Sequence, residues 1–242
     1  MTDFLIFRLY GPLASWGDIA VGERRAGFAR PSKSAALGIV AAALGIKRSD
    51  KEEQGRLAEG YGFAVRVDAH GRSLRDYHTA QTARMADVKK LSKVDSRPLT
   101  RKRLLSVDDP ETILSQRDYL ADALFTVALW KRVGAPNTLA EIRNALTQPK
   151  YALYLGRKSC PPALPLSPEV IEASDLLEAL KQYAPPEFEL GRDSSALLAW
   201  EDNVVPEAPM QQVQRRDSVR DRSRWLFAER QEKEMSLNVR RT

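Results

Sequence analysis

The sequence of 242 residues predicts an α+β fold, and three observations lead to this class. Apolar segments of strand length and two helical patterns follow one another in the order strand, helix, strand, strand, helix, strand. A charged stretch at about residues 79–116 lacks apolar periodicity and interrupts this order as an insertion. Residues 161–242 are rich in proline and then in basic residues. The order is that of a ferredoxin-like or RRM-like domain (βαββαβ), so we predict such a domain over residues 1–160 and a smaller C-terminal extension over residues 161–242.

Short local signals indicate the first strand, the first helix and the second strand. Residues 3–10 (DFLIFRLY) are apolar and aromatic, as in a strand of a well-covered sheet, and a glycine and a proline end them. Residues 31–44 form the first helical pattern, which Gly45 closes. Because this helix is apolar nearly all round, it should be buried. Residues 61–67 (YGFAVRV) predict the second strand.

The remaining elements of the domain lie on either side of the insertion. Residues 74–79 (LRDYHT) have strand character, and residues 120–130 (LADALFTVALW) form a strongly apolar strand. Residues 139–146 predict a short helix with Thr138 as its N-cap, and residues 151–155 predict the next strand. An antiparallel sheet with both helices on one face follows from this order.

The C-terminal extension predicts a helix at residues 173–183 and a strand at residues 224–228. The longest apolar stretch, residues 34–46, is too short to span a bilayer. The start has no basic region followed by a small-residue cleavage site, so we predict no signal peptide. Cys160 is the only cysteine and cannot form an internal disulfide, which points to a reducing compartment. We therefore expect a cytoplasmic protein.

The formal net charge of +6 favours a nucleic-acid partner only weakly, and the distribution of charge says more. Residues 84–103 hold eight Lys or Arg residues against two acids, and residues 215–241 hold nine against five. The first stretch is a cationic block, whereas the second is mixed and is also typical of a solvated surface. The cations of the block are Arg84, Lys89, Lys90, Lys93, Arg97, Arg101, Lys102 and Arg103.

A second group of cations and hydroxyls surrounds the start of the first predicted helix. A helix N-terminus presents free N–H groups and a partial positive charge, and added arginine and hydroxyl groups suit phosphate. The alternative is that Ser32 or Ser34 only caps the helix and that the arginines are solvated. Trp16, in the preceding loop, is expected to pack at the edge of the core rather than to stack on a base. The group consists of Arg24, Arg25, Arg30, Ser32, Lys33 and Ser34.

Tyr77 and His78 are the candidate catalytic residues. With a nearby lysine they could cleave RNA by general acid–base chemistry without a metal. The alternative to catalysis is that His78 lies at a strand end and is hydrogen-bonded to backbone or to RNA. The chain has only two histidines, and we find no HxxxH, CxxC, HxE, GxSxG, GxGxxG or Walker pattern. We therefore predict no metal site and no cofactor.

Cys160 stands in the turn YLGRKSCPP, next to Arg157, Lys158 and Ser159. Neighbouring cations can lower a thiol pKa, as in a catalytic nucleophile. Such a nucleophile also needs a histidine base or a similar activator, and two prolines follow Cys160 directly. Because free cysteines are among the most often buried residues, we expect Cys160 to be buried and the basic turn before it to contact phosphate.

Five segments, in this order, resemble the Cas-five family of CRISPR-associated proteins, and in particular its type I-E Cascade member. The resemblance covers about the first 165 residues, and beyond them only scattered positions such as Trp225 look similar. The segments are FLIFRLYGPLASWG, RPSKSAALGIVAAALGI, LRDYHT, QRDYLADALFTVALW and YLGRKSCPPALPL.

This resemblance implies membership of the repeat-associated RNA-binding superfamily, with an RRM-like fold. One copy sits at the 5′ end of the CRISPR RNA and grips the repeat-derived 5′ handle in Cascade, an antiviral ribonucleoprotein complex. A long insertion, the thumb, reaches over the RNA and packs against the adjacent CasC backbone subunit, and a CasA-type large subunit docks nearby. A separate nuclease processes the RNA in this subtype, whereas the type I-C relative cuts precursor RNA itself with a Tyr, Lys and His set.

Residue by residue, the resemblance places the cationic block in a thumb at about residues 79–116. It places Arg24, Arg25, Arg30 and Lys33 in a basic loop and helix start, and Arg157, Lys158 and Ser159 in a basic turn. Tyr77 and His78 match a motif that type I-E relatives carry without being the processing enzyme. We therefore expect a non-catalytic RNA-binding subunit, with His78 among the RNA contacts. The alternatives are a metal-independent endoribonuclease that processes CRISPR repeat RNA through Tyr77 and His78, and a scaffold that binds only protein partners.

Overall fold

The chain forms two compact units, which we call the core unit and the arm. The core unit comprises residues 1–16, 28–73 and 119–242, and the arm comprises residues 17–27 and 74–118. The structure is a computed structural model, and it describes residues 1–17, 22–94, 98–185, 195–205, 210–221, 224 and 226–238.

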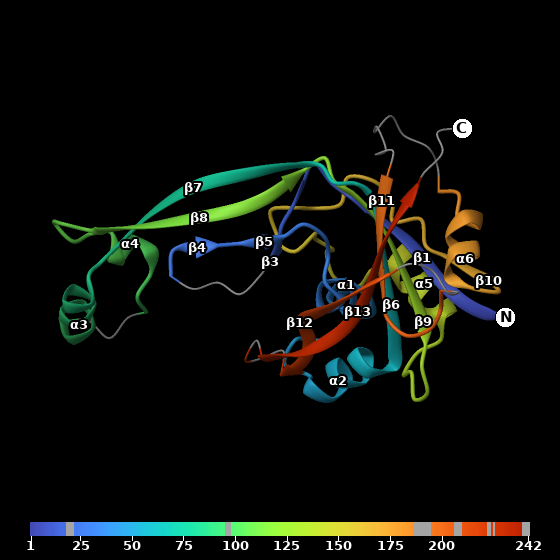
Figure 1. The fold of residues 1–242 in the computed structure, drawn as a ribbon. Coiled ribbons are helices and arrows are strands. Elements are labelled where there is room, and N and C mark those ends of the chain that lie inside the picture. The colour runs from blue at the N-terminus through green and yellow to red at the C-terminus, as the bar shows by residue number, and fades with distance from the viewer. Residues whose placement is uncertain are drawn as a thin grey trace. The chain divides into compact units, whose positions relative to one another are not determined.

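A seven-stranded sheet organises the core unit, with the strand order β10-β1-β9-β6-β11-β13-β12 (Figure 1). Every neighbouring pair in this sheet is antiparallel. The prediction of a mixed fold of helices and antiparallel strands is therefore confirmed. The strands are β1 (Thr2–Tyr10), β6 (Tyr61–Ala69), β9 (Leu124–Lys131), β10 (Glu169–Ala173), β11 (Ser195–Trp200), β12 (Gln211–Asp221) and β13 (Leu226–Asn238).

Four of these strands come from the stretch that the sequence separates as a C-terminal extension. β10 pairs with β1 at one side of the sheet, from Thr2↔Ala173 to Ile6↔Glu169. β11 pairs with β6 on the other side, and β13 and β12 continue from it. Residues 161–242 thus extend the sheet of residues 1–160 on both sides. The boundary between the two compact units does not fall at residue 160, because residues 119–242 all belong to the core unit.

The predicted strand at residues 151–155 is wrong, because the structure has no strand there. The backbone N–H groups of Lys150 and Tyr151 donate to the carbonyls of Ala43 and Ala42 at the end of the first helix, at 3.0 and 3.2 Å. These contacts hold the start of the segment at the end of this helix. The place beside β1 is taken by β10, which lies further along the chain.

The first two predicted helices are confirmed, and local signals set their ends. At the start of α1 (Lys33–Leu44) the Ser32 hydroxyl accepts a hydrogen bond from Ala35 N–H, and Gly45 ends the helix with φ at 80°. Thr138 begins α5 (Leu139–Thr147) with a capping box. The helix predicted at residues 173–183 is α6 (Leu176–Gln182). The charged helix α2 (Lys51–Gly60) has no apolar stripe and was not predicted.

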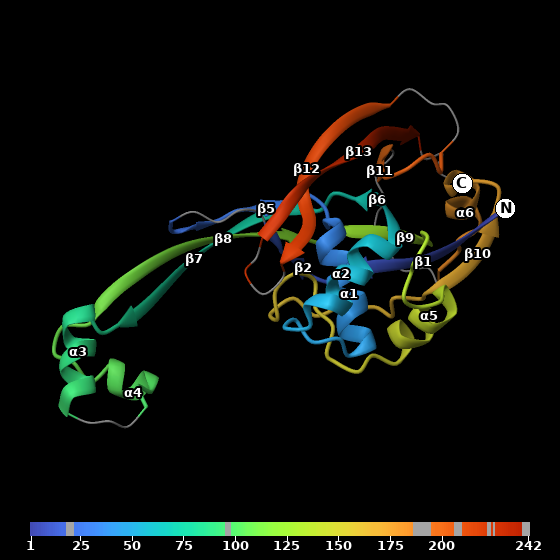
Figure 2. The ribbon, with the colours of Figure 1, turned by 90° about the horizontal axis from the view of Figure 1, so that it is seen from below.

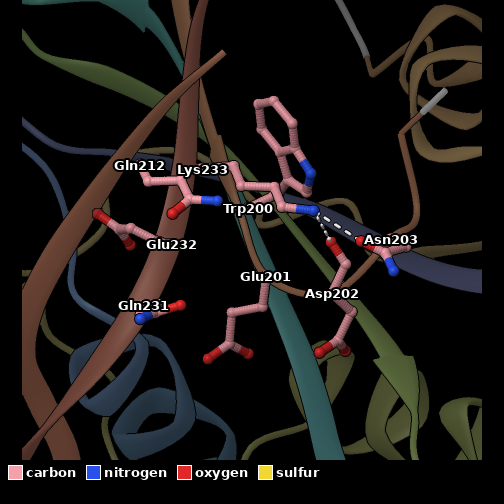
Figure 3. Close-up of a pocket in the computed structure, with 8 residues that line it drawn as sticks. All are labelled: Trp200, Glu201, Asp202, Asn203, Gln212, Gln231, Glu232 and Lys233. Carbon is pink, nitrogen blue, oxygen red and sulfur yellow. Dashed lines mark hydrogen bonds between the residues drawn. The ribbon is translucent and has the colours of Figure 1, made fainter. Parts of the chain in front are cut away.

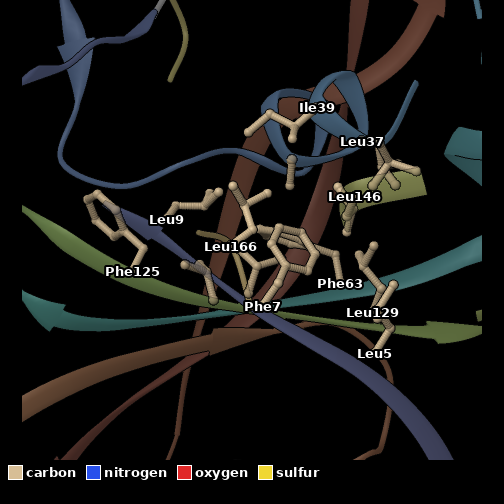
Figure 4. Close-up of a cluster of buried hydrophobic side chains, with 14 of the residues drawn as sticks. Leu5, Phe7, Leu9, Leu37, Ile39, Phe63, Phe125, Leu129, Leu146 and Leu166 are labelled. Carbon is tan, nitrogen blue, oxygen red and sulfur yellow. The ribbon is translucent and has the colours of Figure 1, made fainter. Parts of the chain in front are cut away.

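Helices cover both faces of the core sheet, and each face has its own hydrophobic cluster. Alternation along β1 sends Leu5 and Phe7 into the cluster shared with α1, α2 and α5, and Phe4 and Ile6 into the cluster shared with α6. Figure 2 shows α1, α2 and α5 gathered on one side of the sheet, and Figure 4 shows the side chains that they cover. None of the helices in the described part of the chain is both long and apolar enough to cross a membrane.

The arm is built on a ribbon of two strands, β7 (Arg72–Thr82) and β8 (Glu111–Ala121), which pair with each other. β4 (Arg24–Arg25) joins β8 in parallel, with Arg24 opposite Gln116. The helices α3 (Met85–Val94) and α4 (Arg101–Leu104) lie between β7 and β8 in the sequence, and neither contains a buried residue. The remaining short strands among the described residues are β2 (Leu13–Ala14), β3 (Trp16–Gly17) and β5 (Gly27–Phe28).

Candidate nucleic-acid interface

Carboxylates of the chain itself cover the start of helix α1, where the sequence predicts a phosphate site. The Lys33 backbone N–H donates to Asp217 Oδ2 of β12 at 2.8 Å. The Lys33 ammonium lies 2.9 Å from Glu201 Oε2, and Arg30 pairs with both Glu232 and Glu234 of β13. Ser34 is also buried, and its hydroxyl contacts that of Ser32. A helix N-terminus that already holds carboxylates repels a further anion.

These groups belong to a buried cluster of ion pairs that ties β12 and β13 to the rest of the core unit. Arg230 donates to Asp217 Oδ1 at 2.6 Å and to Glu232 Oε2 at 2.8 Å. Arg215 stacks over the ring of Phe28, 4.2 Å from its centre. Burial lowers the pKa of the Lys33 ammonium, against the opposing effect of Glu201. Arg30 and Lys33 thus act inside the fold, and their basic character in the sequence does not place them on an RNA-facing surface.

A cavity of about 280 Å³ lies beside this cluster, and Figure 3 shows its side chains. The carboxylates that face it are already paired, since Arg132 bonds Glu201 at 3.0 Å and Asp202 at 2.7 Å. Lys233 donates to the Asp202 carbonyl at 3.2 Å and to Asn203 Oδ1 at 2.6 Å. Among the described residues of the lining, no nucleophile therefore stands beside a free base. The lining residues are Trp200, Glu201, Asp202, Asn203, Gln212, Gln231, Glu232 and Lys233.

The arm presents a group of arginines where β4, β7 and β8 run together. Arg75 donates to Asp118 Oδ1 at 2.7 Å, and Arg24 lies 3.5 Å from Asp118 Oδ2. The hydrogen bond from Arg75 lowers the pKa of the Asp118 carboxyl below its usual value. Arg25, a predicted RNA-binding residue, is exposed and stands opposite Arg117 in the β4–β8 pairing. Arg75 and Arg117 were missed, although they lie in the segments LRDYHT and QRDYLADALFTVALW.

The cationic block of the arm contains both exposed and engaged side chains. Arg103 donates to the carbonyls of Leu91 and Pro98 at 2.9 and 3.3 Å, which joins α4 to α3. Arg84 pairs with the exposed Asp109 at 2.6 Å. Arg97 lies outside the described residues. The exposed cations on the two helices are Lys89, Lys90, Lys93, Arg101 and Lys102.

The structure separates the two candidate catalytic side chains. Tyr77 and His78 are consecutive residues of β7, so their side chains point to opposite faces of the ribbon. Tyr77 accepts a hydrogen bond from Gln116 Nε2 at 3.4 Å, whereas His78 Nδ1 lies 4.0 Å from Asp76 Oδ2. The two side chains therefore do not face one common site on the ribbon.

The basic turn at residues 156–160 is anchored to the loop after β1. Arg157 Nε donates to the Ser15 hydroxyl at 2.9 Å, and its guanidinium lies 5.3 Å from the ring centre of Tyr119. Lys158 and Ser159 are exposed. The turn therefore offers an ammonium, a hydroxyl and part of the Arg157 guanidinium to solvent.

The predictions for Cys160 and Trp16 are confirmed, because both side chains are about 1% exposed. Burial raises the pKa of the Cys160 thiol, which keeps it protonated. Trp16 packs edge-on against Phe125, with ring centres 5.8 Å apart. Across the described residues, no three His, Cys, Asp or Glu side chains gather in a way that would hold a metal ion.

Comparison with known proteins places this arrangement in a family. The chain matches the profile of the family described as CRISPR-associated protein (Cas_Cas5) over residues 4–233. It is 38% identical over 193 residues to the CRISPR system Cascade subunit CasD of Escherichia coli (strain K12). The match covers 76% of this chain and 79% of the relative.

Solved structures agree with this assignment. The chain is 27% identical, with a TM-score of 0.66, to a chain of a CRISPR RNA-guided surveillance complex, over 98% of this chain and 90% of that one. It is 28% identical, with a TM-score of 0.59, to a structure described as a Cas protein, over 97% and 95% of the two chains. The resemblance seen in the sequence is thereby confirmed. This protein belongs to the Cas5 family of CRISPR-associated proteins.

Proposed function

We propose that this protein is a non-catalytic, RNA-binding subunit of a type I-E Cascade complex, in which it caps the 5′ handle of the CRISPR RNA. The observation that carries this proposal is the similarity to the Cascade subunit CasD over three quarters of the chain. In this role the protein contacts a CasC-type backbone subunit and a CasA-type large subunit, and it serves antiviral defence. Target DNA is met only through the assembled complex.

The strand order supports an RRM-like core for this role. β10, β1, β9 and β6 are neighbours in that order, and α1 and α5 follow β1 and β9 in the sequence. We infer that these six elements form the ferredoxin-like unit, with β10 as its fourth strand. The insertion between β6 and β9 is then the thumb, and it carries the arm's exposed cations.

In each unit the exposed cations define the RNA-binding surface that we propose. In the arm these are the arginines beside β4 and the cations of α3 and α4, and in the core unit they lie in the turn at residues 157–159. Arg30, Ser32, Lys33 and Ser34 are left out of this surface because they are buried, and Arg30 and Lys33 are paired with carboxylates. Binding through these cations depends on salt, because each phosphate contact releases counterions.

The alternative of a metal-independent endoribonuclease receives no support from the arrangement of Tyr77 and His78. Their side chains lie on opposite faces of β7, so the pair does not form one acid–base site. The alternative of a scaffold that binds only proteins leaves the exposed cations of α3 and α4 without a role.

A gel-shift assay with labelled CRISPR repeat RNA in EDTA tests the proposal. The wild-type protein is expected to shift the RNA without cutting it, and His78→Ala is expected to leave the RNA equally intact. The double variant Arg157→Gln with Lys158→Gln is expected to weaken binding. The matched control, Arg56→Gln with Arg143→Gln, removes the same charge from exposed positions of α2 and α5 and should bind as the wild type does. Discrete fragments that vanish with His78→Ala would overturn the non-catalytic role.

A further inference from the structure

Tyr77 is an unusually exposed aromatic side chain for a folded protein. It stands on strand β7 of the arm with 70% of its surface accessible. Large aromatic side chains usually bury most of their surface, and only the hydroxyl of Tyr77 has a partner in the described structure, at Gln116. The ring faces are therefore available to a planar group from outside.

The neighbours of Tyr77 on the same face of the ribbon are polar and cationic. Arg75 is two residues before Tyr77 on β7, and Gln116 and Asp118 are two residues apart on β8. The bonds from Gln116 to Tyr77 and from Arg75 to Asp118 show that these four side chains meet across the two strands. Arg24 of β4 stands opposite Gln116 and reaches Asp118.

Asp118 pairs with both arginines but leaves part of each guanidinium group accessible. Its side chain is 15% exposed, whereas those of Arg24 and Arg75 are 59% and 45% exposed. Two guanidinium groups against one carboxylate leave a positive charge beside the Tyr77 ring. Each guanidinium has five N–H donors, so both retain donors that are free to bind a phosphate.

An exposed ring beside two fixed cations matches one kind of partner. Single-stranded nucleic acid offers flat bases that stack on aromatic rings and phosphates that pair with arginine. A protein partner would cover the ring with apolar side chains, and the charge of Arg24 and Arg75 opposes such a contact unless it is paired. The amide of Gln116, next to the Tyr77 hydroxyl, adds hydrogen-bonding groups for the edge of a base.

We propose that Tyr77 is a stacking platform for one unpaired base of the bound RNA, that Arg24 and Arg75 hold the phosphates next to that base, and that Asp118 is the positioning residue for both arginines. This inference rests on the proposed RNA-binding function and assigns Tyr77 a binding role in place of a catalytic one.

The test measures RNA affinity of the full-length protein at several salt concentrations for Tyr77→Ala, Tyr77→Phe and Arg75→Gln. Tyr77→Ala is expected to weaken binding about tenfold with an unchanged salt slope, because a stacked base contributes affinity but no ionic contact. Tyr77→Phe keeps the ring and should bind like the wild type. Arg75→Gln should reduce the salt slope by about 0.7. Tyr151→Ala, at a half-exposed tyrosine of the core unit, is the control and should change neither quantity.

A scan of RNAs with one abasic nucleotide locates the stacked base. Removal of the base at one position of the RNA is expected to lower the affinity of the wild type about tenfold. The same removal should hardly change the affinity of Tyr77→Ala, because this variant has no ring for the base to stack on. If Tyr77→Ala binds every RNA as the wild type does, the platform is wrong while RNA binding stands. If Tyr77→Ala impairs only assembly with the other Cascade subunits, the face binds protein and the platform is also wrong. If the wild type does not bind RNA at all, the proposed function itself fails.

Discussion

The backbone N–H of Lys33 donates a hydrogen bond to the Asp217 carboxylate at 2.8 Å, although 184 positions separate the two residues in the sequence. A carboxylate of β12 thereby occupies the position at the start of α1 where an external phosphate would bind. The same carboxylate accepts two hydrogen bonds from Arg230. The first turn of the core helix and the C-terminal hairpin are therefore held together by charge as well as by the sheet.

Asp217→Ala is expected to destabilise the protein by about 3–5 kcal/mol, because it leaves Arg230 buried without one of its main partners. Urea unfolding followed by circular dichroism measures this change. Asp109→Ala is the control, since Asp109 is 77% exposed and its pair with Arg84 should contribute less than about 1 kcal/mol. Equal effects of the two substitutions would show that the buried cluster does not stabilise the fold.

Gly156→Ala is expected to disturb the basic turn through both its backbone angle and its surroundings. Gly156 has φ at 85°, and an added Cβ would lie 1.9 Å from the Ser15 carbonyl oxygen. Gly134 has a similar φ of 83°, but no described atom lies within 4 Å of its added Cβ. Thermal unfolding should therefore report a loss of about 1 kcal/mol for Gly134→Ala and about 3 kcal/mol for Gly156→Ala. Similar losses would mean that the contact with Ser15 is not close.

Cys160 is expected to resist alkylation in the folded protein. Burial raises the pKa of its thiol, so the reactive thiolate is scarcer in the folded protein than in the unfolded chain at the same pH. Iodoacetamide labelling followed by mass spectrometry should be slow in buffer and fast in urea. Labelling in buffer that is as fast as in urea would contradict this environment.

The same pKa shift predicts a pH dependence of stability. A folded-state pKa above the unfolded value means that the folded protein holds the thiol proton more tightly. The contribution of Cys160 is therefore fully present below the ordinary thiol pKa and declines as pH rises through and above it. Unfolding curves of Cys160→Ala should lack this part of the decline when compared with the wild type, and identical pH profiles of the two proteins would contradict the prediction.

The exposed lysines of the arm are expected to determine much of the salt dependence of RNA binding. The triple variant Lys89→Gln, Lys93→Gln, Lys102→Gln removes three exposed charges from α3 and α4. If all three contact phosphates, the slope of log affinity against log salt falls by about 2. The matched variant Lys51→Gln, Lys131→Gln, Lys181→Gln removes three exposed charges from the core unit and should leave the slope unchanged. A similar drop for both variants would indicate a general charge effect rather than contact with the arm.

Several elements could be predicted because their signals lie within a few residues of each other. Ser32 and Gly45 delimit α1, and Thr138 with Glu141 begins α5, since capping depends on neighbouring backbone groups. The apolar run of β1 is equally local. Membership of the family was also predictable, because ordered motifs persist in the sequence. The strand predicted at residues 151–155 was wrong because a short apolar run has the same pattern in a strand and in a loop, and here only Leu155 is buried.

The sequence by itself determined the mixed fold, the main helices, the charge of the arm and the family. Only the tertiary structure decided which cations are exposed, because the side-chain partners of Arg30 and Lys33 lie more than 160 positions away in the sequence. It also decided that Tyr77 and His78 face apart, since this depends on β7 being an extended strand of the ribbon. The burial of a side chain and its ion-pair partners depend on contacts between distant segments, so they cannot be predicted from the order of charges along the sequence.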